Sequence, residues 1–285
     1  MLPDIALRLA KINTLDGRAG YVQGDEIIAR GWAKYLRRLG VNVVLCGKHD
    51  RAAGDVVAHF SLQSEPDSGK KNVLYLQNAF PPEEYQGGTV GMFHRVKSDF
   101  DAFLFPSETL MRACAPGGVV PFATDPEWVT PGRVTNRLPV SFAGNNIRSE
   151  QHNARFLEQA LPELALFGSG WNGILGSACR GPLPVVHLPD LYRRTDVNLN
   201  AHIEEHARNG VVNLRVFDVL ACGAFCLSDP HEAMQALFGD AVPVTQGGLA
   251  LVEDLKHYLE CPNERYWCAQ EGRRIVLAGH TWAYR

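Results

Sequence analysis

Short apolar runs rich in β-branched residues alternate with amphipathic segments along most of the chain, and no other feature of the sequence restricts the fold as much. The runs at residues 5–10 ("IALRLA"), 41–47 ("VNVVLCG") and 55–62 ("DVVAHFSL") are typical of buried strands. Residues 26–40 ("EIIARGWAKYLRRLG") instead repeat their apolar side chains at helical spacing. Strands that alternate with helices are characteristic of a parallel sheet with helices on both faces, so the sequence predicts an α/β fold.

A proline-rich segment interrupts this alternation near the middle of the chain. Residues 121–139 contain four prolines and little helical or strand periodicity, and the alternation resumes after them. We therefore predict a break near residues 123–138, with one domain at 1–125 and a second at 126–285. Two successive α/β halves of similar size predict two Rossmann-like domains that face each other across a cleft. In the second half, the runs at 185–188 and 241–244 are predicted as additional short strands.

Composition and charge argue against several classes of protein. The chain has 46% hydrophobic and 21% charged residues, as an ordinary globular protein does, and a net charge of −3. It has no global basic field that would indicate nucleic acid or a membrane surface as a partner, no apolar run approaching the ~18 residues of a spanning helix, and no signal-peptide pattern. The seven cysteines lack paired spacing, so we expect free thiols, a cytoplasmic location and no metal site.

The segment Asn209–Asp229 ("NGVVNLRVFDVLACGAFCLSD") predicts a short helix, a glycine stop and a buried strand. Asn213 is a short polar residue at the start of the helix, and Arg215 lies in its first turn. The unpaired N–H groups and the dipole of a helix start attract anions, and an arginine there can fork onto a phosphate. Asp218 follows one turn later on nearly the same face and can accept hydrogen bonds from sugar or ribose hydroxyls. The alternative is an intrahelical ion pair between Arg215 and Asp218.

Glycine turns and polar strand ends supply further candidates for ligand contact, because ligands of open α/β sheets bind at the carboxyl ends of strands. Gly168 and Gly170 follow a predicted strand and allow the backbone to approach a ligand closely, with Trp171 placed to pack beside a base. The alternative is a plain strand-ending turn. The remaining candidates lie after two other predicted strands: Gly144 and Arg148 after the first, and Asn198 and Asn200 at the end of the second.

A general base is an ionisable side chain within hydrogen-bond reach of the proton that it removes, and we look for one in the first half. Asp16, Asp25 and His94 are the candidates there, and Asp25 is alternatively the N-cap of the helix at 26–40, which Gly40 ends. The loop between Gly17 and Gly24 lacks the GxGxxG spacing. The chain also has no GxxxxGK[ST] or GxSxG motif, so neither a phosphate-binding P-loop nor a nucleophile elbow is indicated.

The second half resembles a known family. "RVFDVLACGAFCLSD" is similar to the R-x-F-E-x-L-A-C-G signature of spore-maturation-type (CgeB-like) glycosyltransferases, and "VPFATDPEWVTP", "VSFAGNNIRSE", "LALFGSGW", "LYRRTDVNLNAH" and "GHTWAYR" resemble further family segments in the same order. The resemblance covers about residues 119–285, and the first half matches only in outline. It implies a GT-B fold, with the sugar-nucleotide donor in the C-terminal domain and the acceptor in the N-terminal domain.

The resemblance also assigns residues. Arg215 falls on the family's arginine, expected at the donor diphosphate, and Asp218 falls on the family's glutamate, expected near donor hydroxyls. The positions expected to line the donor pocket are Gly144, Gly168, Gly170 and Asn200. Two departures stand out: the carboxylate at 218 is one methylene shorter than in the family, and Glu204 and Glu205 do not match the spacing of a second family carboxylate. Relatives also continue, beyond the position of Arg285, into a helix that crosses back to the first domain.

The sequence thus predicts a metal-independent glycosyltransferase that takes a nucleoside-diphosphate sugar as co-substrate, needs no other cofactor and acts on an unidentified acceptor. Two alternatives stay open. A nucleotide-sugar epimerase on the same scaffold would act on the sugar ring of the donor, whereas an inert sugar-nucleotide-binding protein would bind without turnover.

Overall fold

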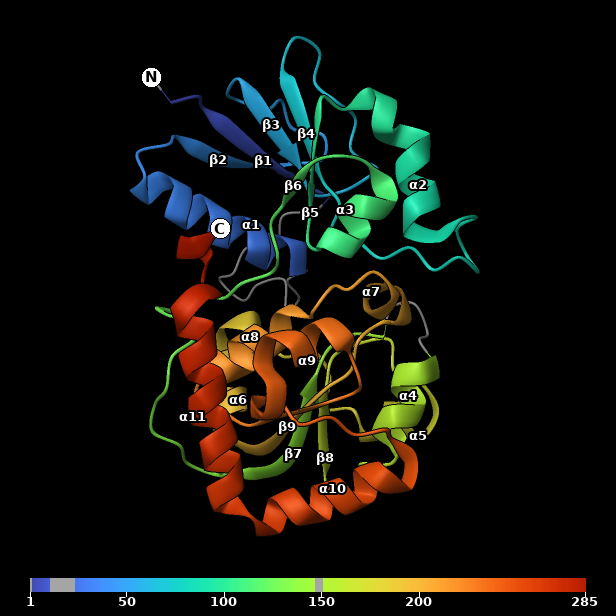
Figure 1. Ribbon diagram of the computed structural model, residues 1–285, viewed down its shortest axis with the longest axis vertical. Helices are drawn as coiled ribbons and strands as arrows, with labels where there is room; N and C mark the ends of the chain where they lie inside the picture. Colours follow the sequence, from blue (N-terminus) through green and yellow to red (C-terminus); the bar gives the residue numbers. More distant parts are fainter. Residues whose placement is uncertain (1, 11–23, 147–150) are drawn as a thin grey trace.

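The computed structural model describes residues 2–10, 24–146 and 151–285, except for the side chains of residues 151 and 152. Its strands form two separate parallel sheets, one above the other in Figure 1. The first sheet has the strand order β2-β1-β3-β4-β5-β6, and the second has the order β10-β9-β7-β8. The strands are β1 (Ile5–Leu9), β2 (Val43–Gly47), β3 (Val56–His59), β4 (Lys71–Tyr75), β5 (Ala102–Phe105), β6 (Gly118–Val119), β7 (Leu138–Ala143), β8 (Leu164–Phe167), β9 (Thr195–Asn200) and β10 (Cys226–Ser228).

Helices cover both faces of the first sheet because successive side chains of its strands point to opposite sides. Tyr75 packs with α1 (Gly24–Arg38), whereas its neighbour Leu74 packs with α2 (Gly88–Val96) and α3 (Glu108–Cys114). The end of α1 follows the expected pattern. Gly40 has a positive φ of 83°, its N–H bonds the Arg37 carbonyl, and the N–H of Val41 bonds the Leu36 carbonyl, which is a Schellman cap.

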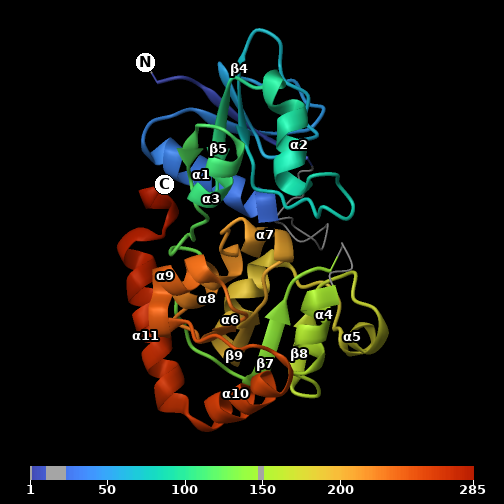
Figure 2. The ribbon, with the colours of Figure 1, turned by 45° about the vertical axis from the view of Figure 1, so that its right-hand side comes forward.

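The second sheet is enclosed in the same way. Helices α4 and α10 pack on one face, and α6 and α8 lie on the other, while α5 flanks β8 (Figure 2). The helices of this half are α4 (Gln151–Glu158), α5 (Gly173–Ala178), α6 (Leu188–Arg194), α7 (Glu204–Arg208), α8 (Leu214–Ala221), α9 (Glu232–Phe238), α10 (Gly248–Glu260) and α11 (Pro262–Gly279). Short 3₁₀ helices are η1 (Lys97–Asp99), η2 (Val185–His187), η3 (Gly239–Ala241) and η4 (Trp282–Tyr284).

Two predicted strands of the second half are wrong. Residues 185–188 form η2 and the start of α6, and residues 241–244 contribute only an isolated bridge between Val244 and Ser228. Apolar runs this short have no periodicity that separates strand from helix, so packing decides. The helices α2, α5 and α7 were not predicted at all.

The segment between the two sheets contributes no strand to either, since β6 ends at Val119 and β7 begins at Leu138. We keep the division at residues 1–125 and 126–285 as a proposal. The C-terminal residues return to the first sheet after α11 (Figure 1). Thr281 forms a parallel bridge with Thr124, and the Arg285 guanidinium donates to the carbonyls of Pro121 and Phe122. The chain therefore crosses back to its first half within residues 280–285.

None of the helices in the described part of the chain has the length and hydropathy that a bilayer crossing requires. The seven cysteines are all free thiols, as the sequence predicts.

Candidate functional site

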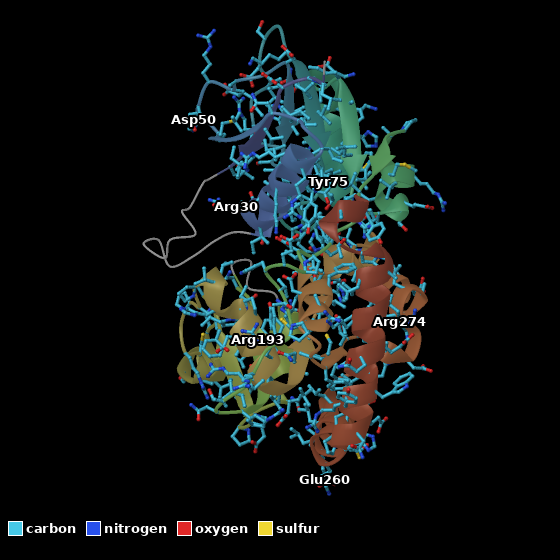
Figure 3. All side chains as sticks on the ribbon, turned by 90° about the vertical axis from the view of Figure 1, so that its left-hand side faces the viewer. Arg30, Asp50, Tyr75, Arg193, Glu260 and Arg274 are labelled. Atoms are coloured by element: carbon cyan, nitrogen blue, oxygen red, sulfur yellow. The ribbon has the colours of Figure 1, made fainter. Side chains whose placement is uncertain are left out.

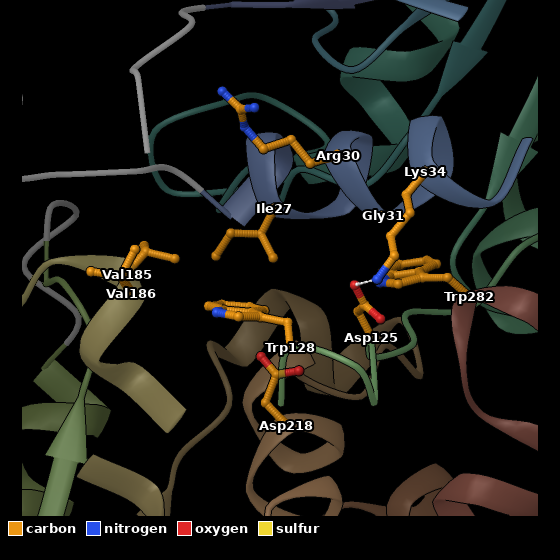
Figure 4. Close-up of a pocket in the computed structure, with 10 residues that line it drawn as sticks. All are labelled: Ile27, Arg30, Gly31, Lys34, Asp125, Trp128, Val185, Val186, Asp218 and Trp282. Atoms are coloured by element: carbon orange, nitrogen blue, oxygen red, sulfur yellow. Dashed lines mark hydrogen bonds and ion pairs between the residues drawn. The ribbon is translucent and has the colours of Figure 1, made fainter. Parts of the chain in front are cut away.

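Two neighbouring cavities lie between the halves of the molecule, at the carboxyl ends of the second sheet and opposite the start of α1. One, the glycine-turn cavity, has a volume of about 270 Å³ and is lined by the turns after β7 and β8 and by Arg215. The other, the α1 cavity, has a volume of about 280 Å³ and lies against α1 (Figure 4). Ile27, Val185 and Asp218 line both cavities. Such a strand-end cleft is where open α/β folds bind ligands.

Arg215 is held in place from three sides. Its Nε donates to the Ala143 carbonyl at 2.9 Å and its Nη1 to Asn200 Oδ1 at 2.8 Å, while the guanidinium stacks on the Phe142 ring at 4.2 Å. Burial lowers the pKa of Arg215 below its ordinary value, because desolvation disfavours the charged form. Its hydrogen-bond partners among the described residues are neutral, and Nη2 has none. The site therefore presents a cation without a direct counter-charge.

The turn glycines leave room for this arrangement. A Cβ on Gly144 would lie 2.6 Å from Arg215 Nη2 and 2.7 Å from the Phe142 ring. Gly168 has a φ of 141°, and a Cβ there would lie 1.8 Å from the Gly144 carbonyl oxygen. Any side chain at either position would displace the turns that line the cavity.

A buried polar chain positions Asn200 behind Arg215. Asn200 is 0% exposed, and its Nδ2 donates to Ser228 Oγ, which in turn donates to Asp229 Oδ1. Asp229 also accepts from the backbone N–H of His202 and bonds His202 Nδ1 at 2.7 Å. This network fixes the amide orientation that presents Oδ1 to Arg215. Sequence reasoning missed the roles of Ser228 and Asp229, since only the pairing of β9 with β10 brings them together.

Asp218 lies where the two cavities meet. It is 4% exposed, and its Oδ1 accepts a hydrogen bond from Thr124 Oγ1 at 2.6 Å. Burial raises the pKa of Asp218 to about 7, with a further contribution from the nearby Asp125 carboxylate, while the Thr124 bond opposes the shift. No ion pair joins Arg215 and Asp218, two residues that the structure describes. The intrahelical alternative therefore does not describe this site.

Several predicted contact residues lie behind the cavity wall rather than in it. Trp171 is a core residue, 8% exposed, whose Nε1 donates to the Gly144 carbonyl, so it supports the turn and does not face a base. Asn198 is 1% exposed, bonding Ser141 Oγ and the carbonyls of Tyr192 and Phe225 inside the sheet. The Asn198 amide is thus bonded inside the sheet, and its side chain lines neither cavity.

Gly170 and Asn213, two more candidates, have structural roles near the cavity. Gly170 has a φ of 79° and follows Gly168 in the same turn without lining either cavity. Asn213 occupies the N-cap position of α8, but its side chain donates to Asn200 Oδ1 and the Ala201 carbonyl instead of capping the helix. The first-turn N–H groups of α8 consequently lack a side-chain cap. Arg148 lies outside the described residues.

Of the three candidate bases, the structure describes Asp25 and His94, and only the helix that carries Asp25 lines a cavity. Asp25 lies inside the first turn of α1 rather than at its N-cap, and its Oδ1 accepts from the N–H of Glu26. Burial raises the pKa of Asp25 to about 6. His94 is exposed on α2 and lines neither cavity, and Asp16 lies outside the described residues.

The structure adds cavity residues that were not among the predicted contacts. Asn145 lines the glycine-turn cavity, and its Oδ1 accepts from the N–H and hydroxyl of Ser169, which ties the two glycine turns together. The segment 182–188 contributes mainly apolar side chains, and Tyr192 and Leu214 complete the wall. Within the described residues, the one grouping suited to a metal ion is His257, Cys261 and Glu264. Glu260, which lies between His257 and Cys261 in the sequence, is at the end of the molecule remote from the first sheet (Figure 3).

A family of known proteins matches the half of the chain that contains Arg215 and the glycine turn after β8. Residues 148–285 match a family model described as glycosyl transferase-like. A comparison with curated protein sequences found no match.

Solved structures are similar along almost the whole chain. Sucrose-phosphate synthase from Thermosynechococcus elongatus aligns with a TM-score of 0.70 and 12% identity, over 98% of this chain and 95% of that one. HepE from Anabaena, in complex with UDP-glucose, aligns with a TM-score of 0.70 and 9% identity, over 99% and 96%. AviGT4, a glycosyltransferase of avilamycin A biosynthesis, aligns with a TM-score of 0.62 and 14% identity, over 99% and 94%. The predicted GT-B fold is thereby confirmed.

Proposed function

We propose that this chain is a glycosyltransferase that transfers a sugar from a nucleoside-diphosphate sugar to an acceptor. The observation that carries the proposal is Arg215, a cation with only neutral hydrogen-bond partners among the described residues, fixed in the wall of a strand-end cavity. A partly desolvated guanidinium favours an anionic ligand that can take paired hydrogen bonds, as a diphosphate does. The uncapped first turn of α8 offers further N–H donors to the same anion.

The arrangement also suits the chemistry of transfer. Negative charge develops on the diphosphate as the bond to the sugar breaks, and preorganised donors stabilise that charge without reorganising during the reaction. Arg215 and the N–H groups of the turns supply such donors, which is our reason for proposing a metal-independent enzyme. The apolar and aromatic wall formed by Leu183, Tyr192 and Leu214 suits the base of the nucleotide.

Similar proteins support the choice of donor. HepE was solved with UDP-glucose, and we extend a UDP-sugar to this chain as the first donor to test. The motifs of the second half, which occur in the same order as in spore-maturation-type glycosyltransferases, support our proposal that the chain is related to that family. The shorter carboxylate at position 218 departs from that family, and here it bonds Thr124.

A donor panel tests the proposal. Binding of UDP-, GDP-, ADP- and dTDP-glucose is measured by ligand-detected NMR, and the products of each bound donor are then analysed. Transfer or slow hydrolysis of a bound donor supports a glycosyltransferase. An epimeric sugar would assign an epimerase instead, and binding without turnover would assign a sugar-nucleotide-binding protein. Absence of binding for every nucleoside diphosphate would contradict the proposal.

A further inference from the structure

The α1 cavity adjoins the glycine-turn cavity and shares Asp218 with it. It therefore lies beside the proposed donor site, where an acceptor has to bind. Its far wall is built by the returning C-terminal segment. Trp282 is 4% exposed and packs directly against Gly31 of α1, where a Cβ would lie 2.5 Å from the indole nitrogen. The cavity is therefore a product of the closed arrangement of the two halves.

Apart from Asp218, the charged side chains that line this cavity are already paired. Lys34 Nζ lies 2.5 Å from Asp125 Oδ2 and 3.0 Å from Glu127 Oε2, and Asp125 Oδ1 also accepts from the Tyr35 hydroxyl (Figure 4). Arg30 bonds the Glu26 carboxylate at 2.7 Å. Arg38 also pairs with Glu127, so that Lys34 and Arg38 balance the carboxylates of Asp125 and Glu127. This charge cluster therefore exerts little net attraction on a strongly charged ligand.

The remaining surface is apolar. Ile27 faces the indole of Trp128 across the cavity, and Val185 and Val186 lie at one end (Figure 4). Most hydroxyl groups of a free sugar would lose water here without gaining a partner, at a cost that a largely apolar ligand avoids. An aromatic ring would instead gain contact with the indole face.

One carboxylate oxygen in this wall is available to accept a hydrogen bond from a hydroxyl group. Asp218 Oδ1 is taken by Thr124, but Oδ2 has no hydrogen-bond partner among the described residues. Sequence reasoning placed the base across the cleft from Asp218, in the first half. In the structure, however, Asp218 lies in the wall of the α1 cavity and faces α1, so a molecule bound in this cavity is within its reach.

We infer that the α1 cavity binds the acceptor, that the acceptor is a small, uncharged, largely apolar molecule with a hydroxyl group, typically a phenol, and that Asp218 accepts the proton of that hydroxyl. This inference rests on the proposed function. In the transfer step, the acceptor oxygen forms a bond to the anomeric carbon while the bond from that carbon to the diphosphate oxygen breaks. The bonding electrons leave with the nucleoside diphosphate, and the acceptor proton moves to Asp218 Oδ2.

The electrostatic surroundings of Asp218 agree with this role. Besides Thr124, the groups that face it are Asp125 from the segment before β7, Arg215 and Cys222 from α8, and Tyr192 from α6. Burial and Asp125 hold its pKa near 7, where a carboxylate is a more effective base than at its ordinary pKa.

Acceptor specificity is tested with a matched pair of variants. Val186→Asp places a charge in the cavity wall at a side chain that is 50% exposed, and Val252→Asp makes the same change at a 45% exposed position on α10. With a UDP-sugar as donor, we expect transfer to 2-naphthol but not to glucose, 4-hydroxybenzoate or tyramine. Val186→Asp should raise the KM for 2-naphthol at least tenfold without changing UDP affinity, whereas Val252→Asp should change neither. Preference for glucose or a charged phenol, or an unaffected KM in Val186→Asp, would overturn the inference.

The role of Asp218 is tested by its isostere. Asp218→Asn should leave UDP affinity within about twofold and lower transfer by roughly 10²–10⁴-fold, the range for loss of a general base. The wild-type rate should rise with pH through about pH 7. A parallel fall in UDP affinity, or a rate that keeps its rising limb in Asp218→Asn, would return Asp218 to donor recognition.

Failure of the proposed function is a separate result. Direct binding of 2-naphthol, followed by ligand-detected NMR in the absence of donor, tests the cavity by itself. If 2-naphthol binds to wild type and less well to Val186→Asp while no nucleoside diphosphate binds, the proposed function is wrong and the ligand class of the cavity stands. If UDP binds and 2-naphthol does not, the acceptor inference is wrong and the donor site stands.

Discussion

Replacing Arg215 with alanine removes the cation from the glycine-turn cavity and tests the donor site directly. In the wild type, Nε and Nη1 donate to the Ala143 carbonyl and to Asn200, and Nη2 has no hydrogen-bond partner among the described residues in a side chain that lines the cavity. A hydrogen bond to a charged group contributes about 1.5–3 kcal/mol. We therefore expect UDP affinity to fall by about 10- to 150-fold, since each 1.4 kcal/mol corresponds to a tenfold change.

Stability should change little in the same variant. The substitution loses two hydrogen bonds to neutral groups and the stacking on Phe142, but it also removes the cost of desolvating a charge, the same cost that lowers the pKa of Arg215. Asn200 Oδ1 keeps its bond from Asn213. The two effects on the free energy of unfolding oppose each other.

Isothermal titration calorimetry with UDP and thermal unfolding are the measurements. Arg137→Ala is the matched control, because it removes one arginine beside the opposite end of β7, where Arg137 pairs with Asp196 far from the cavity. Arg215→Lys separates charge from forked geometry and should recover only part of the affinity. Unchanged UDP binding with a lowered melting temperature in Arg215→Ala would show that Arg215 is structural and refute the donor-site assignment.

Three further substitutions follow from the same geometry. Gly144→Ala should weaken UDP binding at least tenfold by pushing a Cβ into Arg215 Nη2, whereas Gly279→Ala, with nothing within 4 Å of its Cβ, should not; equal affinities in titration would contradict this. Gly31→Ala should lower the free energy of unfolding by about 1–3 kcal/mol through its clash with Trp282, and a gain in stability from the better helix former would count against that packing. Asp218 has a folded pKa raised from 3.8 to about 7, so its contribution to stability is complete below about pH 4 and is lost as pH rises through about 7. Denaturant unfolding should accordingly show wild type losing stability relative to Asp218→Asn across that window, and a constant difference between them would contradict the raised pKa.

Local patterns were sufficient for much of the architecture. The apolar runs predicted β1, β2 and β3, and the helical spacing and Gly40 predicted α1 with its end, because these signals depend on neighbours within one turn or one strand. The two runs of four residues near η2 and η3 were misassigned because a segment that short has no period to measure. Helices α5 and α7 have only six and five residues, too few to give a strong helical period.

The sequence by itself determined that two α/β units follow one another, that glycine turns end β7 and β8, and that Arg215 lies in the first turn of a helix. Only the tertiary structure decided which side chains face a ligand. Asn200 and Trp171 looked like contacts from their positions at strand ends, yet both lie behind the wall, one orienting Arg215 and the other supporting Gly144. The bond from Thr124 to Asp218 joins residues 94 positions apart, and the contact of Trp282 with Gly31 spans most of the chain. Periodicity records which face of an element is apolar, but contacts between distant segments depend on how the two halves close on each other, and that closure creates the cavity beside α1.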